Sequence, residues 1–290
     1  MPERPAVDVV VPIAAPAPEV RALVARLRRL ALAAGDWLTV VDNRGVGAGE
    51  PEVLVAAQVP TSYFARNRGA ERGAAPWLLF LDADVDAPPD LLDRLFDPAP
   101  AEQTAILAGA VLDEAPGDGA PPAARWAALK ASMSQPIAEA YGRWAFAQTA
   151  NCAVRRAAFE ALGGFRDDVR SGGDADLCWR LRAAGWELEG RPAAAVVHRS
   201  RRSIRALLRQ QARHGAGAGW LAREYPGAFP RRRLPGLAWW SARRAGGGMV
   251  ALARGDRDAA VVGLLDGPTV WAFELGRLRS NRPKALRQRR

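Results

Sequence analysis

Short apolar runs separated by helix-like segments make up the first part of the chain. Residues 7–13, 37–41 and 77–81 are almost wholly apolar, which is typical of strands buried on both faces of a sheet. Residues 17–34 carry apolar side chains at helical spacing, namely Val20, Leu23, Val24, Leu27 and Leu30. This order of strand, helix and strand predicts an α/β fold with a mostly parallel sheet, helices on both faces and right-handed crossovers.

The pattern beyond these runs keeps the same alternation. Further strands are expected at 52–57, 104–112, 186–189 and 194–197, with an extended segment at 144–151. Helices are expected to begin at Arg66 and to cover 89–96, 125–133, 156–162, 174–184 and 203–224. A polar, Pro- and Gly-rich stretch at 113–122 is typical of a loop.

The last third is apolar enough for two more helices, at 237–253 and 259–278. Asp266-Gly267-Pro268 interrupts the second one and excludes a straight membrane span. Aromatic residues lie among the arginines of this region, namely Trp239, Trp240, Trp271 and Phe273. They suit either a helical cap on the sheet or an interfacial membrane contact, and the pattern leaves both open.

Composition sets the class of protein. A chain of 290 residues with 49% hydrophobic content can bury one large core with an appendage. Cys152 and Cys178 give neither a zinc spacing nor a disulfide framework, which favours a reducing compartment. Residues 7–13 are too short for a signal peptide or a membrane span, so we expect a cytoplasmic protein.

The net charge of +10 is unevenly distributed. Residues 199–290 carry 21 Lys and Arg against 5 Asp and Glu, a net of +16, whereas the residues before them carry 20 against 26, a net of −6. A segment with this imbalance is attracted to anionic lipid, nucleic acid or a phosphorylated substrate.

Two groups of carboxylates give the chain its candidate chemistry. The apolar run at 77–81 leads directly into Asp82, Asp84 and Asp86. Ligands bind at the carboxyl ends of strands in open α/β sheets, and carboxylates at alternate positions can hold a divalent cation that neutralises a diphosphate. An ordinary acidic turn after a strand has the same pattern.

The second group follows a glycine turn and begins a predicted helix, with Asp174 and Asp176 in its first turn. Either residue alone suits a capping role. Two separate carboxylate sites also suit a group transfer, in which one site holds a metal-diphosphate and the other removes a proton from an incoming hydroxyl.

Seven motifs follow one another over residues 7–225, namely Val9-Val10-Val11-Pro12, Asp42, Ala65-Arg66-Asn67-Arg68-Gly69, Asp82-Ala83-Asp84, Asn151 to Arg155, Leu162-Gly163-Gly164-Phe165 and Gly173-Asp174-Ala175-Asp176-Leu177. This ordered set resembles the family 2 glycosyltransferases of the GT-A fold. The segment from His198 to Gly227 is also similar to mycofactocin-type glycosyltransferases. The resemblance implies a GT-A domain at 1–228 and a basic helical C-terminal extension at 229–290.

The resemblance also implies a role for each matching residue. Asp174 would be the catalytic base, with Asp176 and Trp179 on the acceptor side. Asp42 would contact the base or ribose of a nucleotide-diphosphate sugar. The rest of the donor site would comprise Pro12, Ile13, Ala14, Arg66, Asn67, Asp82, Ala83 and Asp84.

A divalent cation, Mn²⁺ or Mg²⁺, would be held by Asp84 and His198. The imidazole of His198 follows an apolar run and can reach the same cation as Asp84, or it can be satisfied by hydrogen bonds beside the arginines. Asp86 lies beyond the motif and suits a solvated loop, and Asp176 can equally be a capping residue.

Three positions depart from the family pattern. Ile13-Ala14-Ala15 is apolar where many relatives are polar or aromatic, so nucleotide contacts there would come from backbone groups. Asn43-Arg44-Gly45 follows Asp42 in place of Asp-Gly-Ser, which bears on base recognition. Gly173 replaces a glutamate, and the loss of that neighbouring charge lowers the pKa of Asp174 relative to the family pattern.

The leading hypothesis is a metal-dependent inverting glycosyltransferase, a hexosyltransferase using a UDP- or GDP-sugar. Its acceptor would be a glycan, lipid, peptide or small molecule, and peripheral contact with the inner face of the plasma membrane is left open by the charge. The alternative is a catalytically degenerate GT-A scaffold that binds a membrane or nucleic acid. A nucleotidyltransferase is a further alternative, which the Asp174 cluster after Gly-Gly-Phe disfavours.

Overall fold

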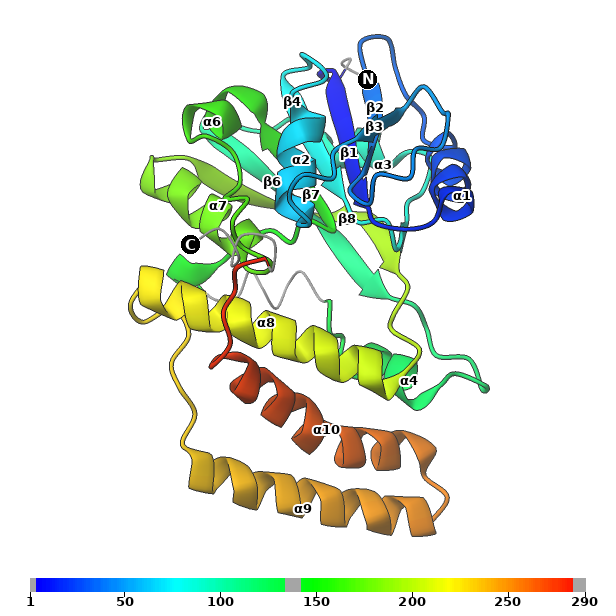
Figure 1. Ribbon diagram of the computed structural model, residues 1–290, viewed down its shortest axis with the longest axis vertical. Coiled ribbons are helices and arrows are strands. Elements are labelled where there is room, and N and C mark those ends of the chain that lie inside the picture. Colours follow the sequence, from blue (N-terminus) through cyan, green and yellow to red (C-terminus); the bar gives the residue numbers. More distant parts are fainter. Residues whose placement is uncertain (1–3, 134–141, 284–290) are drawn as a thin grey trace. The chain divides into compact units, whose positions relative to one another are not determined.

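The structure is a computed structural model that describes residues 4–133 and 142–283 (Figure 1). It divides into two compact units. The sheet unit comprises the described residues up to Leu112, those from 142 to His198, and Arg282 and Pro283. The helical unit comprises Asp113–Met133 and Arg199–Asn281.

The sheet unit contains one eight-stranded sheet. Its strands lie in the order β3 (Val53–Val55), β2 (Trp37–Asp42), β1 (Val7–Ile13), β4 (Trp77–Leu81), β7 (Asn151–Arg155), β6 (Thr104–Asp113), β8 (Glu187–His198) and β5 (Val85–Asp86). The strands from β3 to β4 are parallel, whereas β4–β7, β6–β7 and β5–β8 pair antiparallel, so the sheet is mixed. Ile13 pairs with Asp42 and Val10 with Phe80, which brings the carboxyl ends of β1, β2 and β4 to one edge.

β4 lies at the centre of the sheet, and all five of its residues are buried, as its unbroken apolar run predicts. Phe80 packs against Phe159 and Phe165, with ring centroids 5.6 and 5.0 Å apart. Phe165 belongs to the Gly-Gly-Phe turn, so the core of the sheet fixes one side of that turn.

The helices of the sheet unit are α1 (Ala17–Leu27), α2 (Ser62–Ala70), α3 (Leu91–Leu95), α6 (Arg156–Ala161) and α7 (Gly173–Ala183). α2 packs on β1 and β2 at Gly69, where a Cβ atom would lie 2.4 Å from Val10 Cγ1 and 2.8 Å from Val41 Cγ2. Only glycine permits this close approach. The preceding residues Arg66 and Asn67 are thereby held next to the sheet.

Several predicted boundaries were wrong. α1 ends at Leu27, seven residues before the predicted end, and within 144–151 Trp144 ends a 3-10 helix and a turn at 149–150 precedes β7, which begins at Asn151. β8 is one continuous strand where two were expected. The strand continues through Gly190 and Pro192, which flank Arg191. The buried guanidinium of Arg191 donates to Leu95 O and Pro98 O, and these contacts hold the strand in place there.

The helical unit contains α4 (Pro122–Leu129), α8 (Ile204–Glu224), α9 (Leu234–Ala253) and α10 (Arg257–Gly276), and α10 lies between α8 and α9 (Figure 1). Glycines allow these helices to touch. A Cβ atom at Gly276 would lie 2.2 Å from Ala212 O, and one at Gly263 would lie 2.6 Å from Gly248 Cα. Pro268 does not end α10, contrary to the prediction, and Thr269 Oγ1 donates to Leu265 O at 2.8 Å just beyond it.

A buried carboxylate connects three helices of this unit. Asp266 accepts from Trp126 Nε1 at 2.9 Å and from Arg244 Nη2 at 2.7 Å, so it joins α10 to α4 and α9. No helix within the described ranges is long and apolar enough to cross a membrane. The domain boundary at residue 228 stays a prediction, and residues 284–290 of the predicted extension lie outside the described part of the chain.

Candidate active site

Asp42 ends β2 and organises the loop that follows it. Its side chain is fully buried, and its Oδ1 accepts from the backbone N–H groups of Arg44 at 2.9 Å and Gly45 at 3.0 Å. Oδ2 accepts from Gly47 N at 2.8 Å. Burial alone would raise the pKa of Asp42, but the backbone donors outweigh burial and hold the pKa below its ordinary value. The carboxylate is therefore ionised and already engaged with its own loop.

The end of β1 lies beside this loop. Asn43 N donates to Ile13 O at 2.8 Å, and the Asn43 side chain donates to Ala56 O and Val59 O. Pro12 is buried, Ile13 is half-buried and Ala14 is exposed. Pro12, Ile13 and Ala14 thus lie at the carboxyl end of β1, and Ala14 is the residue of the three that is exposed to solvent.

Arg66 projects from α2 and meets the first acid of the β4 motif. Its side chain is 3% exposed, and Nη2 lies 2.5 Å from Asp82 Oδ1, while the Asp82 side chain is 33% exposed. The guanidinium lies 5.6 Å from the ring centroid of Tyr63 and 6.0 Å from that of Phe165. The guanidinium thus lies beside a pair of aromatic rings that contact each other, and Asp82 keeps an exposed side.

Asn67 holds the Gly-Gly-Phe turn. Its Nδ2 donates to Phe165 O at 2.8 Å, and its Oδ1 accepts from Phe165 N at 3.0 Å. A Cβ atom at Gly164 would lie 2.8 Å from the same Oδ1, so this turn position excludes larger residues. The amide is thus used within the protein, at the point where α2 meets the turn before α7.

Asp84 and His198 come together because β5 pairs with β8, with Val85 opposite His198. His198 Nε2 lies 3.7 Å from Asp84 Oδ2, and the side chains are 5% and 29% exposed. Ala83 O, between the two acids, accepts from Arg26 at 2.5 Å. In the part of the chain that the structure describes, no cluster of three or more His, Cys, Asp or Glu side chains has the arrangement of a metal site.

Asp86 is placed differently from the other two acids of its motif. Its Oδ1 lies 3.1 Å from Arg29 Nη2 and 4.0 Å from Arg26 Nε, and its side chain is 47% exposed. This is a surface ion pair, as expected for an acid outside the site, but Asp86 lies in strand β5 and not in the predicted loop.

Asp174 lies in the first turn of α7, which follows Gly172, whose φ of +83° favours glycine. Its Oδ1 accepts from Ala175 N at 3.0 Å and from the Tyr63 hydroxyl at 3.4 Å. Burial raises the pKa of Asp174, opposed by the Ala175 N–H and Arg66, and Asp82 raises it further. Asp174 is therefore a carboxylate with raised basicity within the electrostatic reach of Arg66 and Asp82.

Tyr63 was not singled out by sequence reasoning. It lies on α2, is 6% exposed, and packs so closely against α7 that a Cβ atom at Gly173 would lie 2.9 Å from its ring. A side chain at position 173 would therefore collide with the ring in its present position. A lone aromatic residue in a helical pattern gives no sign of such a contact.

Asp176 is an internal anchor in this structure. It is fully buried, and its carboxylate lies 2.9 Å from Arg180 and 3.3 Å from Arg166 Nε. Arg180 also donates to Leu162 O and Gly164 O, so this ion pair joins α7 to the turn before it. Trp179 lies on the same helix, is 5% exposed, and donates from Nε1 to Trp144 O at 3.1 Å.

Residues 39–217 match the family model described as glycosyltransferase like family 2. The chain belongs to this family. It is 31% identical over 228 residues to a pre-mycofactocin glycosyltransferase of Mycobacterium tuberculosis, covering 76% of this chain and 48% of that protein. It is 28% identical over 166 residues to the glycosyltransferase AglE of Haloferax volcanii, covering 57% of this chain and 53% of AglE. The chain thus spans about half the length of these curated relatives.

A solved mannosyltransferase structure supports the architecture. The mannosyltransferase PcManGT from Pyrobaculum calidifontis, in complex with GDP-Man and Mn²⁺, matches with a TM-score of 0.57 at 16% sequence identity. The match covers 95% of this chain and 74% of that one. At this identity the likeness bears on the fold alone, and it confirms the expected GT-A class with a helical C-terminal region.

Proposed function

We propose that this family 2 protein is a metal-dependent inverting glycosyltransferase, which moves a hexose from a nucleotide-diphosphate sugar to an acceptor hydroxyl. The observation that carries the proposal is the position of buried Arg66. It binds Asp82 at 2.5 Å and acts electrostatically on Asp174, so it connects the two carboxylate groups. A transfer reaction requires such neighbouring donor and acceptor sites.

The donor half would lie along the strand edge. Asp82 and Asp84, with Ala83 between them, would face the ribose and diphosphate, and the nucleotide would extend toward Asp42. Pro12, Ile13 and Ala14 would contribute backbone contacts. GDP-Man in the complex of PcManGT supports a nucleotide-sugar donor here.

Asp84 and His198 would hold the cation. A carboxylate oxygen and an imidazole nitrogen 3.7 Å apart can share one Mn²⁺ or Mg²⁺, with phosphate oxygens and water filling the other positions. The Mn²⁺ bound with PcManGT supports this assignment. When bound, the cation would neutralise negative charge on the diphosphate leaving group.

Asp174 would accept the proton of the acceptor hydroxyl. Its raised pKa brings its basicity closer to neutral pH, which suits a general base. As the hydroxyl loses its proton to Asp174, its oxygen bonds to the anomeric carbon, and the bond from that carbon to the diphosphate oxygen breaks. Attack from the face opposite the leaving group inverts the anomeric centre.

The acceptor side would depend on residues that shape the surroundings of Asp174. The Tyr63 hydroxyl would keep the carboxylate in position. Asp176 would act through its ion pair with Arg180, which sets the turn before α7, and Trp179 would support the same helix. Arg66 and Asn67 would border the nucleotide from α2.

Nucleotide binding in the presence and absence of a metal tests the donor half. UDP or GDP should raise the melting temperature only with Mn²⁺ or Mg²⁺, because binding to the folded state at about 100 times Kd contributes ~2.7 kcal/mol. Asp84→Asn should remove this metal-dependent shift, whereas the matched variant Asp86→Asn should keep it. A screen of nucleotide sugars with Mn²⁺ then identifies the donor. A shift that is equal in EDTA would contradict the metal assignment.

A further inference from the structure

α9 presents large apolar side chains to solvent. Six of its large hydrophobic residues are at least one-third exposed, with relative values of 57% for Leu234, 66% for Trp239, 37% for Trp240, 58% for Met249, 51% for Val250 and 54% for Leu252. Only Leu237 and Gly248 of this helix are buried. A soluble protein rarely gathers exposed apolar groups on one helix without a partner for them.

The packing of α9 explains why these side chains are left outside. Gly248 lies against Gly263 of α10, where a Cβ atom would lie 3.0 Å from Gly263 C. The backbones of α9 and α10 therefore touch directly at these two glycines. The large apolar side chains of α9 take no part in this contact. Trp239, Arg243, Gly246 and Val250 recur at helical spacing on the side away from this contact.

The same region is strongly cationic. Residues 231–254 contain six arginines, at 231, 232, 233, 243, 244 and 254, and no acidic residue. Arg244 is engaged by Asp266. Arg243 is exposed on the same side as Trp239, so a guanidinium and an indole are presented together.

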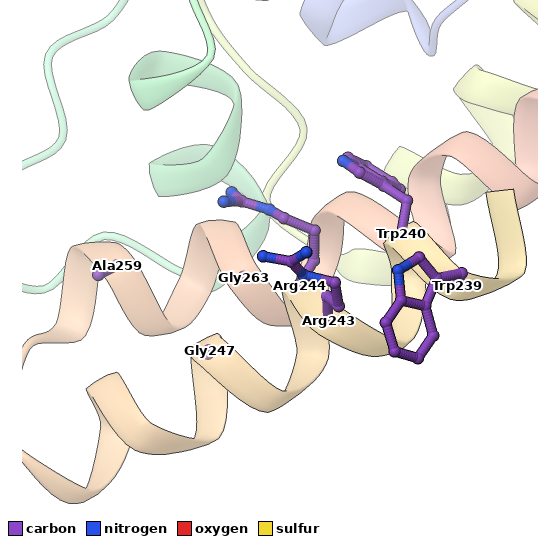
Figure 2. Close-up of a pocket in the computed structure, with 8 residues that line it drawn as sticks. Trp239, Trp240, Arg243, Arg244, Gly247, Ala259 and Gly263 are labelled. Carbon is purple, nitrogen blue, oxygen red and sulfur yellow. The ribbon is translucent and has the colours of Figure 1, made fainter. Parts of the chain in front are cut away.

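A groove of about 550 Å³ lies between α9 and α10, beside Trp239 and Trp240 (Figure 2). Its lining combines two indoles and two guanidinium groups with a glycine-rich backbone, from Trp239, Trp240, Arg243, Arg244, Gly247, Gly248, Ala259 and Gly263. An apolar groove edged by cations fits a ligand that has an anionic head next to an apolar body.

We propose that this face of α9 docks on an anionic phospholipid membrane, with the helix lying in the plane of the interface. Indoles prefer the boundary between headgroups and acyl chains, and guanidinium groups bind lipid phosphates. No described helix can span a bilayer, so the contact would be peripheral. The α9 face comprises Trp239, Arg243, Met249 and Val250, which are exposed and lie on one side of the helix.

Charge distinguishes this partner from two others. A second copy of the chain would oppose one arginine-rich face to another, and like charges repel. Nucleic acid would attract the arginines, but phosphate contacts give no role to exposed Met249, Val250 and Leu252. An anionic bilayer satisfies both the cationic and the apolar side chains.

Vesicle flotation with the full chain tests the proposal. The wild type should bind phosphatidylcholine vesicles containing phosphatidylglycerol, should bind pure phosphatidylcholine far more weakly, and should lose affinity as NaCl is raised. Arg243→Gln should weaken binding about fivefold, and Trp239→Ser with Val250→Ser about tenfold or more. These side chains are exposed, so an unchanged melting temperature serves as the folding control.

Matched variants on the sheet unit make the result specific. Trp37→Ser and Arg29→Gln remove an exposed indole and an exposed guanidinium elsewhere, and both should leave vesicle affinity unchanged. Binding that survives the α9 variants would overturn the proposal. Two other results would also overturn it, each combined with no vesicle binding by the wild type. One is a dimer that Trp239→Ser dissociates, and the other is an oligonucleotide complex that Arg243→Gln weakens.

The vesicle measurement uses no nucleotide sugar and does not depend on the proposed transfer reaction. An α9 variant that loses vesicle binding should still transfer sugar to a soluble acceptor, because its residues lie outside the donor and acceptor sites. Loss of transfer with intact vesicle binding would count against the proposed function alone.

Discussion

The loop after β4 and the start of α7 each carry two acids at alternate positions, and the structure uses them differently. In both places one acid is paired with arginine: Asp82 with Arg66, and Asp176 with Arg180 and Arg166. Asp84 lies 3.7 Å from His198 Nε2, and Asp174 accepts a hydrogen bond from the Tyr63 hydroxyl. The sequence spacing is the same, but the four roles are not.

Burial separates the two arginine-paired acids. The Asp82 side chain is 33% exposed, whereas that of Asp176 is fully buried. Asp82 can therefore exchange contacts with a ligand, but Asp176 cannot reach one without breaking its ion pair. Exposure therefore distinguishes the two acids: Asp82 is open to a ligand, whereas Asp176 is an internal anchor.

Removing the charge that joins the two regions should have the largest effect. Arg66→Gln should lower kcat/KM about 10²- to 10³-fold, as loss of a preorganised charge does in other active sites. Without Arg66 the pKa of Asp174 should rise further, so the acid limb of the pH–rate profile should move to higher pH. Arg68→Gln, on the exposed side of the same helix, should leave activity and the profile unchanged. An unchanged pH–rate profile would show that Arg66 does not couple Asp82 to Asp174.

Breaking the anchor should chiefly affect folding. Asp176→Asn leaves Arg180 without its buried counter-ion and should lower the free energy of unfolding by about 3 kcal/mol, since removal of one partner of a buried pair is strongly destabilising. Denaturant unfolding measures this, with exposed Asp168→Asn as the control. Full stability combined with lost acceptor affinity would instead give Asp176 a direct acceptor role.

Asp42 gives a pH-dependent contrast with Asp174. The pKa of Asp42 is lower in the folded than in the unfolded chain, so its stabilisation is present above about pH 4 and is lost as the pH falls through the folded value. Asp42→Asn should cost about 2 kcal/mol at neutral pH, because hydrogen bonds to a charged group are replaced. Unfolding at pH 7 and at pH 3 should show this difference shrinking in acid. A constant difference would contradict the account.

The smallest effect is expected from removing the long hydrogen bond between Tyr63 and Asp174, the proposed base. Tyr63→Phe keeps the ring contact with Phe165 but removes the hydroxyl that lies 3.4 Å from Asp174 Oδ1. Transfer should fall by less than about tenfold, in line with the net value of one neutral hydrogen bond. Tyr225→Phe, outside the site, is the control. A loss as large as that of Arg66→Gln would make Tyr63 a principal part of the site.

The sequence predicts the local part of this fold well. An unbroken apolar run can only be a buried strand or a buried helix, and its length at 77–81 favours the strand that is found. Glycine before two acids similarly predicts the start of α7. β8 was divided wrongly because Gly190 and Pro192 are local stop signals, and the contacts of Arg191 that override them are distant in sequence.

The site depends more on distant contacts than the fold does. Tyr63 meets Asp174 across 111 residues, and Asn67 meets Phe165 across 98. No spacing rule predicts these pairs. The motifs predict which acids belong to the site, and that assignment stays a prediction. Whether Asp176 is an anchor or an acceptor ligand depends on Arg166 and Arg180, whose positions only the folded chain reveals.

The central claim is that Asp174 carries the proton chemistry and that the donor binds independently of it. The most direct test measures transfer and nucleotide affinity on one preparation of Asp174→Asn, once the donor is identified. Transfer should fall about 10²- to 10⁴-fold, as expected for loss of a general base, while the metal-dependent affinity for the nucleotide stays within about twofold of the wild type. Retained turnover, or a parallel loss of nucleotide affinity, would contradict the account.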